Sequence, residues 1–189
     1  MLLILESVGE TEVYEDVAGR PVMPSLRRIA TENLHFTDFY PAGDKSCQAM
    51  PAVFAGMPAQ PAGNLLWRTP LNALECLPLA LRERGYRTAY FHGSDLGFEQ
   101  QRDFLRMAGF EELHELDVRD PTPVYGWGLS DRVTLGRLRT WLEQRRTEDP
   151  DEPFLAVWFS LSSHDPFLLP PDVDRVFSKA APTFSGRDG

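Results

Sequence analysis

The run of residues from Phe154 to Leu161 constrains the fold of this chain more than any other segment. It reads Phe-Leu-Ala-Val-Trp-Phe-Ser-Leu and is almost entirely apolar, as expected for a β-strand that is covered on both faces. Shorter apolar runs, Leu2 to Leu5 and Arg87 to Phe91, predict further strands. Helix-like segments separate these runs, and this alternation predicts an α/β fold with a largely parallel sheet flanked by helices.

The segments between the apolar runs carry the features of helices and loops. Apolar residues at helical spacing, with Pro near the start or Gly at the end, predict helices at residues 24–30, 49–55, 73–84, 98–108 and from Ser130 or Asp131 to about Arg146. Alternating apolar residues predict one more strand at 34–40. We expect loops at 11–22, at 60–70, which is rich in Pro and Gly, and at 111–123, where His114 would lie on the surface.

Residues capable of chemistry follow the predicted strands. Glu6, His92 and His164 each come after an apolar run, and Ser46 lies in a polar loop before the helix at 49–55. Because parallel strands end at the same edge of a sheet, where α/β proteins bind ligands, we expect these side chains to converge. Ser46 has two interpretations, a helix cap or an activated nucleophile whose anionic product is held at a helix N-terminus. Either histidine is equally compatible with a hydrogen-bonding role in a turn.

Composition narrows the classes of function. A chain of 189 residues is long enough for one domain with a substantial core. Its net charge of −9 argues against nucleic-acid binding and against a polybasic membrane contact. An anionic substrate would therefore need a local cation or a metal. Cys47 and Cys76 form neither a disulfide framework nor a metal-type pair, and no run is long and apolar enough to cross a membrane.

Short motifs along the chain are similar to those of a known family. In chain order they are Leu3-Ile4-Leu5-Glu6-Ser7, Met23-Pro24-Ser25-Leu26, Phe36 to Tyr40, Gly43-Asp44-Lys45-Ser46 with Pro51 to Gly56, Leu77 to Leu81, Gly85 to Gly93, Phe98 to Phe104, Trp127 to Asp131, and Leu161 to Phe167. Together, in this order, they resemble the lipoteichoic-acid-synthase-like branch of the alkaline phosphatase and sulfatase superfamily. The resemblance implies a metal-dependent phosphoglycerol-type transferase with the α/β fold predicted above.

The resemblance implies roles for the residues at the predicted sheet edge. Glu6 corresponds to a metal ligand, and Ser46 to the Thr or Ser nucleophile that both binds the metal and is transiently phosphorylated. Mn²⁺ is the expected cation, with Mg²⁺ or Zn²⁺ as alternatives. Such a cation would lower the pKa of the hydroxyl and neutralise charge on the phosphoryl group.

The resemblance also implies substrate contacts. His92 and His164 correspond to histidines that hold the phosphoryl or glycerol part of the substrate. Arg102 corresponds to a substrate-contacting arginine, although the alignment also permits Gln101. Lys45 stands where an Arg is frequent and supplies a point charge without the bidentate geometry of a guanidinium.

One part of the family pattern has no counterpart. The family completes its metal site with an Asp-His pair in a Gly-Asp-His stretch downstream of the His164 segment, and this sequence contains no such stretch. Two oxygen ligands alone would hold Mn²⁺ weakly. We therefore expect a single incomplete sulfatase-like catalytic domain over residues 1–189, with the C-terminal part of the fold missing.

The resemblance further implies partners and location. The donor would be a lipid such as phosphatidylglycerol and the acceptor a glycan or glycerolipid. A complete relative would be membrane-anchored with this domain on the periplasmic or cell-surface side.

Alternative functions are a sulfatase or a phosphodiester hydrolase on the same scaffold, or a truncated non-catalytic fragment. The sulfatase signature, Cys/Ser-x-Pro-x-Arg, is absent at Ser46 and Cys47, so we rank sulfate-ester hydrolysis below phospho-transfer.

Overall fold

The computed structural model of the protein describes residues 1–59, 65–67 and 74–169. The predictions for the tail after residue 169, for most of the loop at 60–70 and for the first residue of the helix at 73–84 lie outside these residues. The described residues form two compact units, one containing Met1–Glu6 and Tyr40–Leu168 and the other containing Ser7–Phe39.

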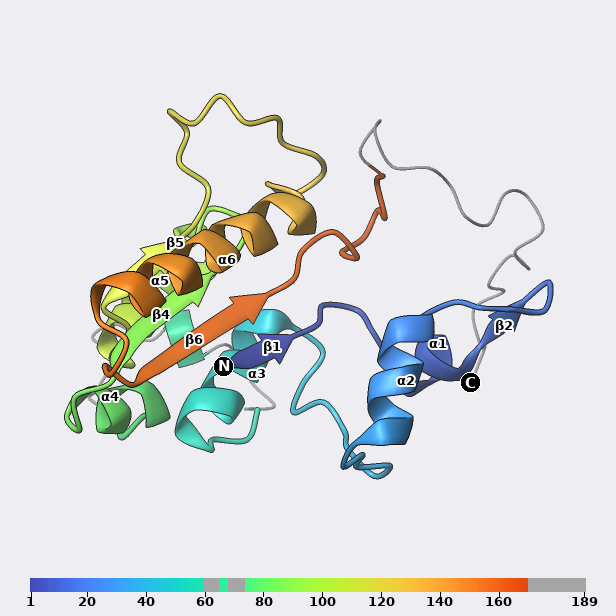
Figure 1. The fold of residues 1–189 in the computed structure, drawn as a ribbon, viewed down its shortest axis with the longest axis horizontal. Helices are drawn as coiled ribbons and strands as arrows, with labels where there is room; N and C mark the ends of the chain where they lie inside the picture. The colour runs from blue at the N-terminus through green and yellow to red at the C-terminus, as the bar shows by residue number, and fades with distance from the viewer. Residues whose placement is uncertain (60–64, 68–73, 170–189) are drawn as a thin grey trace. The chain divides into compact units, whose positions relative to one another are not determined.

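The larger unit is built on a four-stranded sheet in the order β1-β6-β4-β5 (Figure 1). The strands are β1 (Leu2–Ile4), β6 (Phe154–Phe159), β4 (Arg87–Phe91) and β5 (Glu112–His114). Every neighbouring pair is parallel. The prediction of an α/β fold with a parallel sheet is therefore confirmed.

The register of the strands brings their carboxyl ends together. Ile4 pairs with Phe159, and Phe91 pairs with both Trp158 and His114. The residues that follow β1, β4 and β6 consequently meet along one edge, which we call the carboxyl rim. This alignment places the segments that begin at Leu5, His92 and Ser160 beside one another.

Helices cover the two faces of the sheet. Helices α3 (Ser46–Ala55), α4 (Leu77–Arg82) and α5 (Gln101–Met107) contribute to the main core, in which Phe54, Phe104 and Leu105 pack with Tyr90, Val157 and Phe159 of the strands. Helix α6 (Asp131–Glu148) packs Leu138 and Trp141 against the opposite faces of β4 and β6. Burial on both sides explains why β6 is a continuous apolar run and why β4 is apolar from Ala89 to Phe91.

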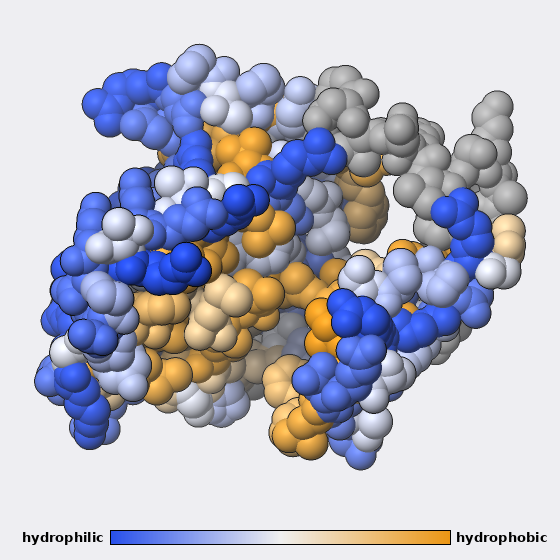
Figure 2. Space-filling model, viewed as in Figure 1, coloured by the Kyte–Doolittle hydropathy of each residue, from blue (hydrophilic) through white to orange (hydrophobic). Residues whose placement is uncertain are grey.

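Strand β1 is more exposed than β4 and β6. Leu3 is 49% exposed and Leu5 is 37% exposed. Figure 2 shows hydrophilic residues over α6 and apolar residues in the region of β1 and β6 below it.

Several helix boundaries differ from the predictions. The helix predicted at 98–108 is divided into the 3₁₀ turn η2 (Phe98–Gln100) and α5, because Glu99 and Gln100 adopt left-handed φ angles of 53° and 58°. Helix α4 begins at Leu77 with Pro78 in its first turn, as the fixed φ of proline favours. A further 3₁₀ turn, η1, spans Leu65–Trp67.

Two strand-level predictions were wrong. Residues 34–40 form no strand; the alternating apolar residues there are exposed, with Leu34 at 83% and Phe36 at 69%. Conversely, β5 was predicted as loop because it is short and carries Glu112 and His114. The ring of His114 is partly buried and stacks on Phe91 with 4.2 Å between ring centroids, so its predicted place on the surface was also wrong.

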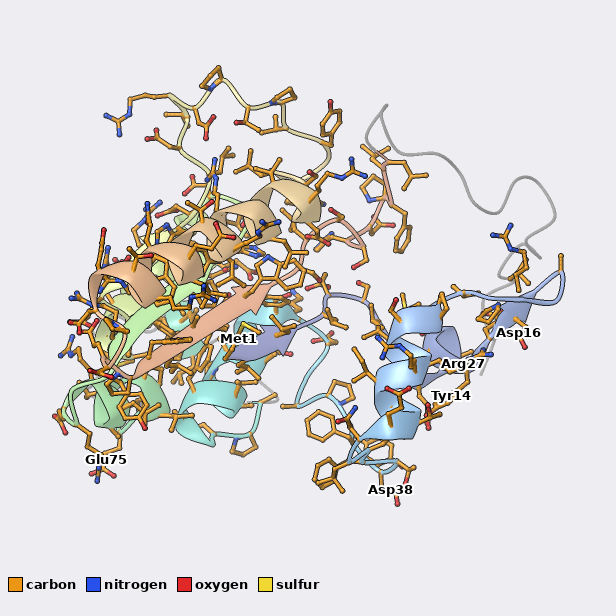
Figure 3. The ribbon with its side chains drawn as sticks, in the orientation of Figure 1. Met1, Tyr14, Asp16, Arg27, Asp38 and Glu75 are labelled. Carbon is orange, nitrogen blue, oxygen red and sulfur yellow. The ribbon has the colours of Figure 1, made fainter. Side chains whose placement is uncertain are left out.

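The smaller unit contains α1 (Glu10–Tyr14), the antiparallel pair β2 (Asp16–Val17) and β3 (Arg20–Pro21), and α2 (Pro24–Glu32). The prediction of a helix from Pro24 is confirmed, whereas the predicted loop at 11–22 was wrong because it contains most of α1 and a hairpin. Arg27 connects these elements by donating to Asp16 Oδ1 over 3.0 Å and to the backbone carbonyls of Val13 and Glu15 (Figure 3). Within the described residues of the chain, no helix has the length and apolar character needed to cross a membrane.

Candidate active site

Ser46 and Glu6 form the centre of the carboxyl rim. Glu6 follows β1, and Ser46 is the first residue of α3. The Ser46 hydroxyl donates a hydrogen bond to Glu6 Oε2 over 2.8 Å. Lys45, not Ser46, occupies the N-cap position, and no side chain caps this helix. The interpretation of Ser46 as a helix cap is therefore wrong, and its hydroxyl is directed to the carboxylate instead.

The backbone of Glu6 is held from both sides by serines after β6. The Glu6 N–H donates to Ser160 Oγ over 2.7 Å, and the Ser163 hydroxyl donates to the Glu6 carbonyl. Ser160 is 3% exposed. Neither serine was identified from the sequence. The signal was present for Ser160, since a serine within a buried apolar run needs a hydrogen-bond partner.

Asp131 fixes the segment that carries these serines. Its Oδ1 accepts hydrogen bonds from the N–H groups of Leu161 (2.7 Å) and Ser162 (3.2 Å), and Ser162 Oγ accepts from the Asp131 N–H over 2.8 Å. The sequence predicts Ser130 or Asp131 as the start of this helix. The residue before Asp131, Ser130, is the N-cap of α6 and makes no capping bond with its side chain. We call Glu6, Ser46, Ser160, Ser163 and Asp131 the Glu6 corner.

Two glycines allow the turn before α6 to approach the end of β4. Leu129 N–H donates to the Gly93 carbonyl over 2.9 Å. A Cβ on Gly93 would lie 2.5 Å from the Leu129 carbonyl oxygen, and one on Gly128 would lie 2.1 Å from the Gly93 carbonyl oxygen. Side chains at these positions would therefore force the turn away from the rim.

His92 is buried at the end of β4, with only 6% of its surface exposed. Its Nδ1 lies 3.0 Å from the Phe159 carbonyl oxygen, which can only accept, so Nδ1 carries the proton and Nε2 presents a lone pair. Burial lowers the pKa of His92 below its ordinary value, although the bond to Phe159 and the charges of Glu6 and Asp131 act in the opposite direction. His92 is therefore neutral at pH 7.

His164 lies in the loop after β6. Its Nδ1 is 2.8 Å from the Asp165 carbonyl oxygen, and its ring lies against Trp127 at a centroid distance of 5.0 Å. Trp127 Nε1 donates to the same Asp165 carbonyl over 2.7 Å. The ring of Phe98 also contacts Trp127, with 5.8 Å between the ring centroids. We call residues 164–168 the His164 loop; its residues from Asp165 on are exposed.

Lys45 and Arg102, the two predicted cationic substrate contacts, have different surroundings. Lys45 is exposed immediately before Ser46. Arg102 is engaged by two carboxylates, with Nη2 at 2.7 Å from Glu115 Oε2 and 2.8 Å from Asp95 Oδ1. These hydrogen bonds and charges raise the pKa of Arg102. The neighbouring Gln101, the alternative in the alignment, is buried at 5% exposure, and its Oε1 has no hydrogen-bond partner among the described residues.

The chain was compared with models of known protein families. The family model described as Sulfatase matches residues 1–188. The chain belongs to the sulfatase family.

Relatives of this sulfatase-family chain agree with the resemblance seen in its motifs. "Phosphoglycerol transferase I" of Xanthomonas campestris pv. campestris (strain B100) is 27% identical over 179 residues, which cover 85% of this chain and 24% of the relative. "Lipoteichoic acid synthase 2" of Bacillus subtilis (strain 168) is 22% identical over 169 residues, covering 86% of this chain and 25% of the relative. The chain therefore spans about a quarter of the length of these curated relatives.

A solved structure shows the same fold. The lipoteichoic acid synthase LtaP from Listeria monocytogenes superimposes with a TM-score of 0.81 at 23% identity, over 90% of this chain and 42% of that one. The resemblance to the lipoteichoic-acid-synthase-like branch of the alkaline phosphatase superfamily is confirmed.

The sulfatase-family chain presents an oxygen-rich pair where a divalent cation would be expected. A carboxylate and a hydroxyl oxygen are the hard donors that Mn²⁺ and Mg²⁺ prefer, and Glu6 Oε2 and Ser46 Oγ already lie 2.8 Å apart. Among the described residues no group of three or more His, Cys, Asp or Glu side chains could hold a metal. The donor chemistry of Glu6 and Ser46 fits such a cation, but this pair supplies only part of a coordination shell.

Cys47 does not supply a second nucleophile. It is the second residue of α3, and its side chain is buried, with 1% exposure. Burial raises the pKa of its thiol to about 12, and a hydrogen bond with the Glu99 carboxylate adds to the increase. A thiol with this pKa remains protonated at neutral pH and is unreactive.

Proposed function

We propose that this chain carries the nucleophile side of a phosphoglycerol transferase centre. The observation that supports the proposal most strongly is the 2.8 Å hydrogen bond from the Ser46 hydroxyl to Glu6, at the N-terminus of α3. The names of the relatives supply the reaction class, and the donor class would be a phosphatidylglycerol-like lipid.

In the first step the Ser46 oxygen attacks the phosphorus of the donor. A bond forms between Ser46 Oγ and phosphorus, the bond from phosphorus to the diacylglycerol oxygen breaks, and diacylglycerol leaves with the proton that Ser46 loses. Glu6 is the group to which that proton is hydrogen-bonded. A divalent cation held by Glu6 and Ser46, with Mn²⁺ as the first expectation, would make the hydroxyl more acidic and offset phosphoryl charge.

In the second step an acceptor hydroxyl attacks the phosphorylated serine. The bond from phosphorus to Ser46 Oγ breaks, and the acceptor proton returns to the serine. The acceptor class would be a glycan or glycerolipid hydroxyl. The N-terminal end of α3 favours the negative charge of the intermediate, as helix N-termini do for phosphate.

The histidines and cations are proposed as substrate contacts with different roles. Neutral His92 presents Nε2 as an acceptor, which suits a glycerol hydroxyl better than a phosphate oxygen. His164 presents its ring beside Trp127, and Lys45 adds a positive charge next to the nucleophile. Arg102 has the least support, because Asp95 and Glu115 already engage its guanidinium.

The test is detection of a glycerophosphoryl adduct on Ser46. This chain and the longest in-frame product of its gene are incubated with phosphatidylglycerol and Mn²⁺ and analysed by mass spectrometry. We expect the adduct in the longest product, its loss by more than about a hundredfold in Ser46→Ala, and its retention in Ser46→Thr and in the control Ser25→Ala. An adduct that persists in Ser46→Ala, or none in the longest product, contradicts the proposal.

The same experiment addresses the alternatives. Release of free glycerol phosphate without an acceptor would indicate a phosphodiester hydrolase, and turnover of a sulfate ester would indicate a sulfatase. An adduct in the longest product but not in this chain would identify the 189-residue chain as a non-catalytic fragment, in line with its partial set of donor oxygens.

A further inference from the structure

A tight turn after β6 carries two neighbouring serines that bond to different elements. The His164 N–H closes the turn by donating to the Leu161 carbonyl over 3.0 Å, which leaves Ser162 and Ser163 at its centre. Ser162 Oγ accepts a hydrogen bond over 2.8 Å from the N–H of Asp131, the first residue of α6. The Ser163 hydroxyl donates to the segment that follows β1. Ser162 therefore anchors the turn to α6, whereas Ser163 anchors it to the end of β1.

The acceptor of the Ser163 hydroxyl is the carbonyl of Glu6, at a point where the backbone is constrained. The next residue, Ser7, has a φ angle of 51°, which is uncommon for residues other than glycine because Cβ approaches the following carbonyl oxygen. Such conformations persist where the surrounding structure holds them. The Glu6 N–H donates to Ser160 Oγ over 2.7 Å, and the Glu6 carbonyl accepts from Ser163. Both sides of Glu6 are therefore fixed, and its carboxylate lies 2.8 Å from the Ser46 hydroxyl.

His164 follows Ser163 directly in the chain but is placed by contacts of its own. Its Nδ1 lies 2.8 Å from the Asp165 carbonyl oxygen, and its ring contacts Trp127. Neither contact involves the Ser163 hydroxyl. Loss of that hydroxyl should therefore disturb Glu6 while the contacts of His164 stay in place.

We propose that Ser163 is a positioning residue for the transfer step, because its hydrogen bond to the Glu6 carbonyl sets the direction of the Glu6 carboxylate toward Ser46. The inference rests on the proposed function, since it requires that Glu6 act on the Ser46 hydroxyl. Ser163 acts through Glu6, so its effect is on the maximal rate of transfer and not on binding of the lipid donor. A small displacement of a reacting group can lower a rate by about a hundredfold, and loss of a residue that orients a ligating side chain typically costs about 10- to 100-fold.

The experiment compares the two serines of the turn in the longest in-frame product of the gene. Ser163→Ala removes the hydroxyl, Ser163→Thr keeps one, and Ser162→Ala is the matched control at the neighbouring position. Formation of the glycerophosphoryl adduct on Ser46 is followed by mass spectrometry over a range of phosphatidylglycerol concentrations with Mn²⁺. The maximal rate and the half-saturating donor concentration are obtained separately, at a temperature below the thermal unfolding midpoint of every variant.

We expect Ser163→Ala to lower the maximal rate by at least about tenfold and to change the half-saturating donor concentration by less than about threefold. Ser163→Thr should keep the maximal rate within about threefold of the parent, because it retains the donor. Ser162→Ala should also keep it, even with a lower unfolding midpoint, because Ser162 bonds to α6 and not to Glu6.

Other outcomes contradict the role of Ser163. Equal losses of maximal rate in Ser163→Ala and Ser163→Thr, or in Ser163→Ala and Ser162→Ala, would show that the Ser163 hydroxyl is not the cause. If the adduct forms in the parent and is lost in Ser46→Ala, but Ser163→Ala reacts at the parent rate, the role of Ser163 is refuted and the proposed function stands. If the parent forms no adduct, the proposed function and the role of Ser163 both fail.

Discussion

The Glu6 corner and the His164 loop lie at the same rim of the sheet but are held very differently. In the Glu6 corner, Ser46, Ser160 and Ser163 bond to Glu6, and Asp131 bonds to the backbone that presents two of these serines. In the His164 loop, the imidazole has one hydrogen-bond partner among the described residues, the carbonyl of Asp165, and its ring contacts the half-exposed ring of Trp127.

If the proposed function holds, this difference separates the residue that would react, Ser46, from the loop that would receive the substrate. A nucleophile gains most when its geometry is fixed before the substrate arrives, and the network around Glu6 meets that requirement. A loop with exposed side chains and few hydrogen bonds opens at low free-energy cost. We therefore expect the Glu6 corner to be rigid and the His164 loop to adjust to the substrate.

The largest effect should follow removal of the Asp131 carboxylate. Asp131→Ala leaves the N–H groups of Leu161 and Ser162 without their acceptor, so the free energy of unfolding should fall by about 2 kcal/mol. Denaturant titration measures this, and Asp151→Ala, at an exposed position, should change it by less than about 0.5 kcal/mol. Equal values for the two variants would show that the Glu6 corner is not rigidly held.

An intermediate effect should appear in the pH dependence of stability. Because the pKa of His92 is lowered in the folded state, the unfolded chain binds more protons below about pH 6.5. Stability should be full above that pH and fall as the solution is acidified toward the lowered pKa, with a slope of at most about 1.4 kcal/mol per pH unit for this group. His92→Asn should flatten the slope measured in denaturant titrations at pH 5, 6, 7 and 8.

The contribution of His114 must be separated from that of His92. Burial also lowers the pKa of His114, so it adds a slope of the same sign. His114→Phe, which keeps a ring against Phe91, serves as the comparison. If His92→Asn leaves the slope of a His114→Phe background unchanged, His92 is not held neutral by the fold.

The smallest effect on stability should come from the His164 loop. Trp127→Phe removes the donor to the Asp165 carbonyl, and because Trp127 is 49% exposed the free energy of unfolding should change by only about 0.5 kcal/mol. The Michaelis constant for the lipid donor in the longest in-frame product should rise several-fold, since Trp127 supports His164. A loss of stability as large as that of Asp131→Ala would remove the distinction between the two regions.

The sequence was informative where burial determines residue type. Strands β4 and β6 are buried on both faces, so their apolar residues predicted the strands and the rim at which Ser46 and Glu6 meet. Strand β5 is three residues long with polar members, and no local pattern distinguishes it from a loop. The alternation at 34–40 is typical of a strand. A strand also needs a neighbouring strand to pair with, and the local sequence does not show whether one is present.

The residues that organise the site were harder to predict than those that would react. Ser163 and Asp131 act through hydrogen bonds to backbone groups 157 and 30 residues away in the sequence, and such contacts depend on the packing of α6 against the sheet. Only Ser160 carried a sequence signal, as a polar residue within the apolar run 154–161. The split of η2 from α5 depends on the left-handed Glu99 and Gln100, which no residue preference predicts.

Strand β1 has a neighbour on one side only among the described residues, and that neighbour is β6. Its other edge carries backbone donors and acceptors that can accept one more strand. A parallel strand added there, in register with β1, would end at the same rim, close to Glu6. If Glu6 holds a cation as proposed, residues following such a strand could supply the further oxygen or nitrogen ligands that Glu6 and Ser46 lack.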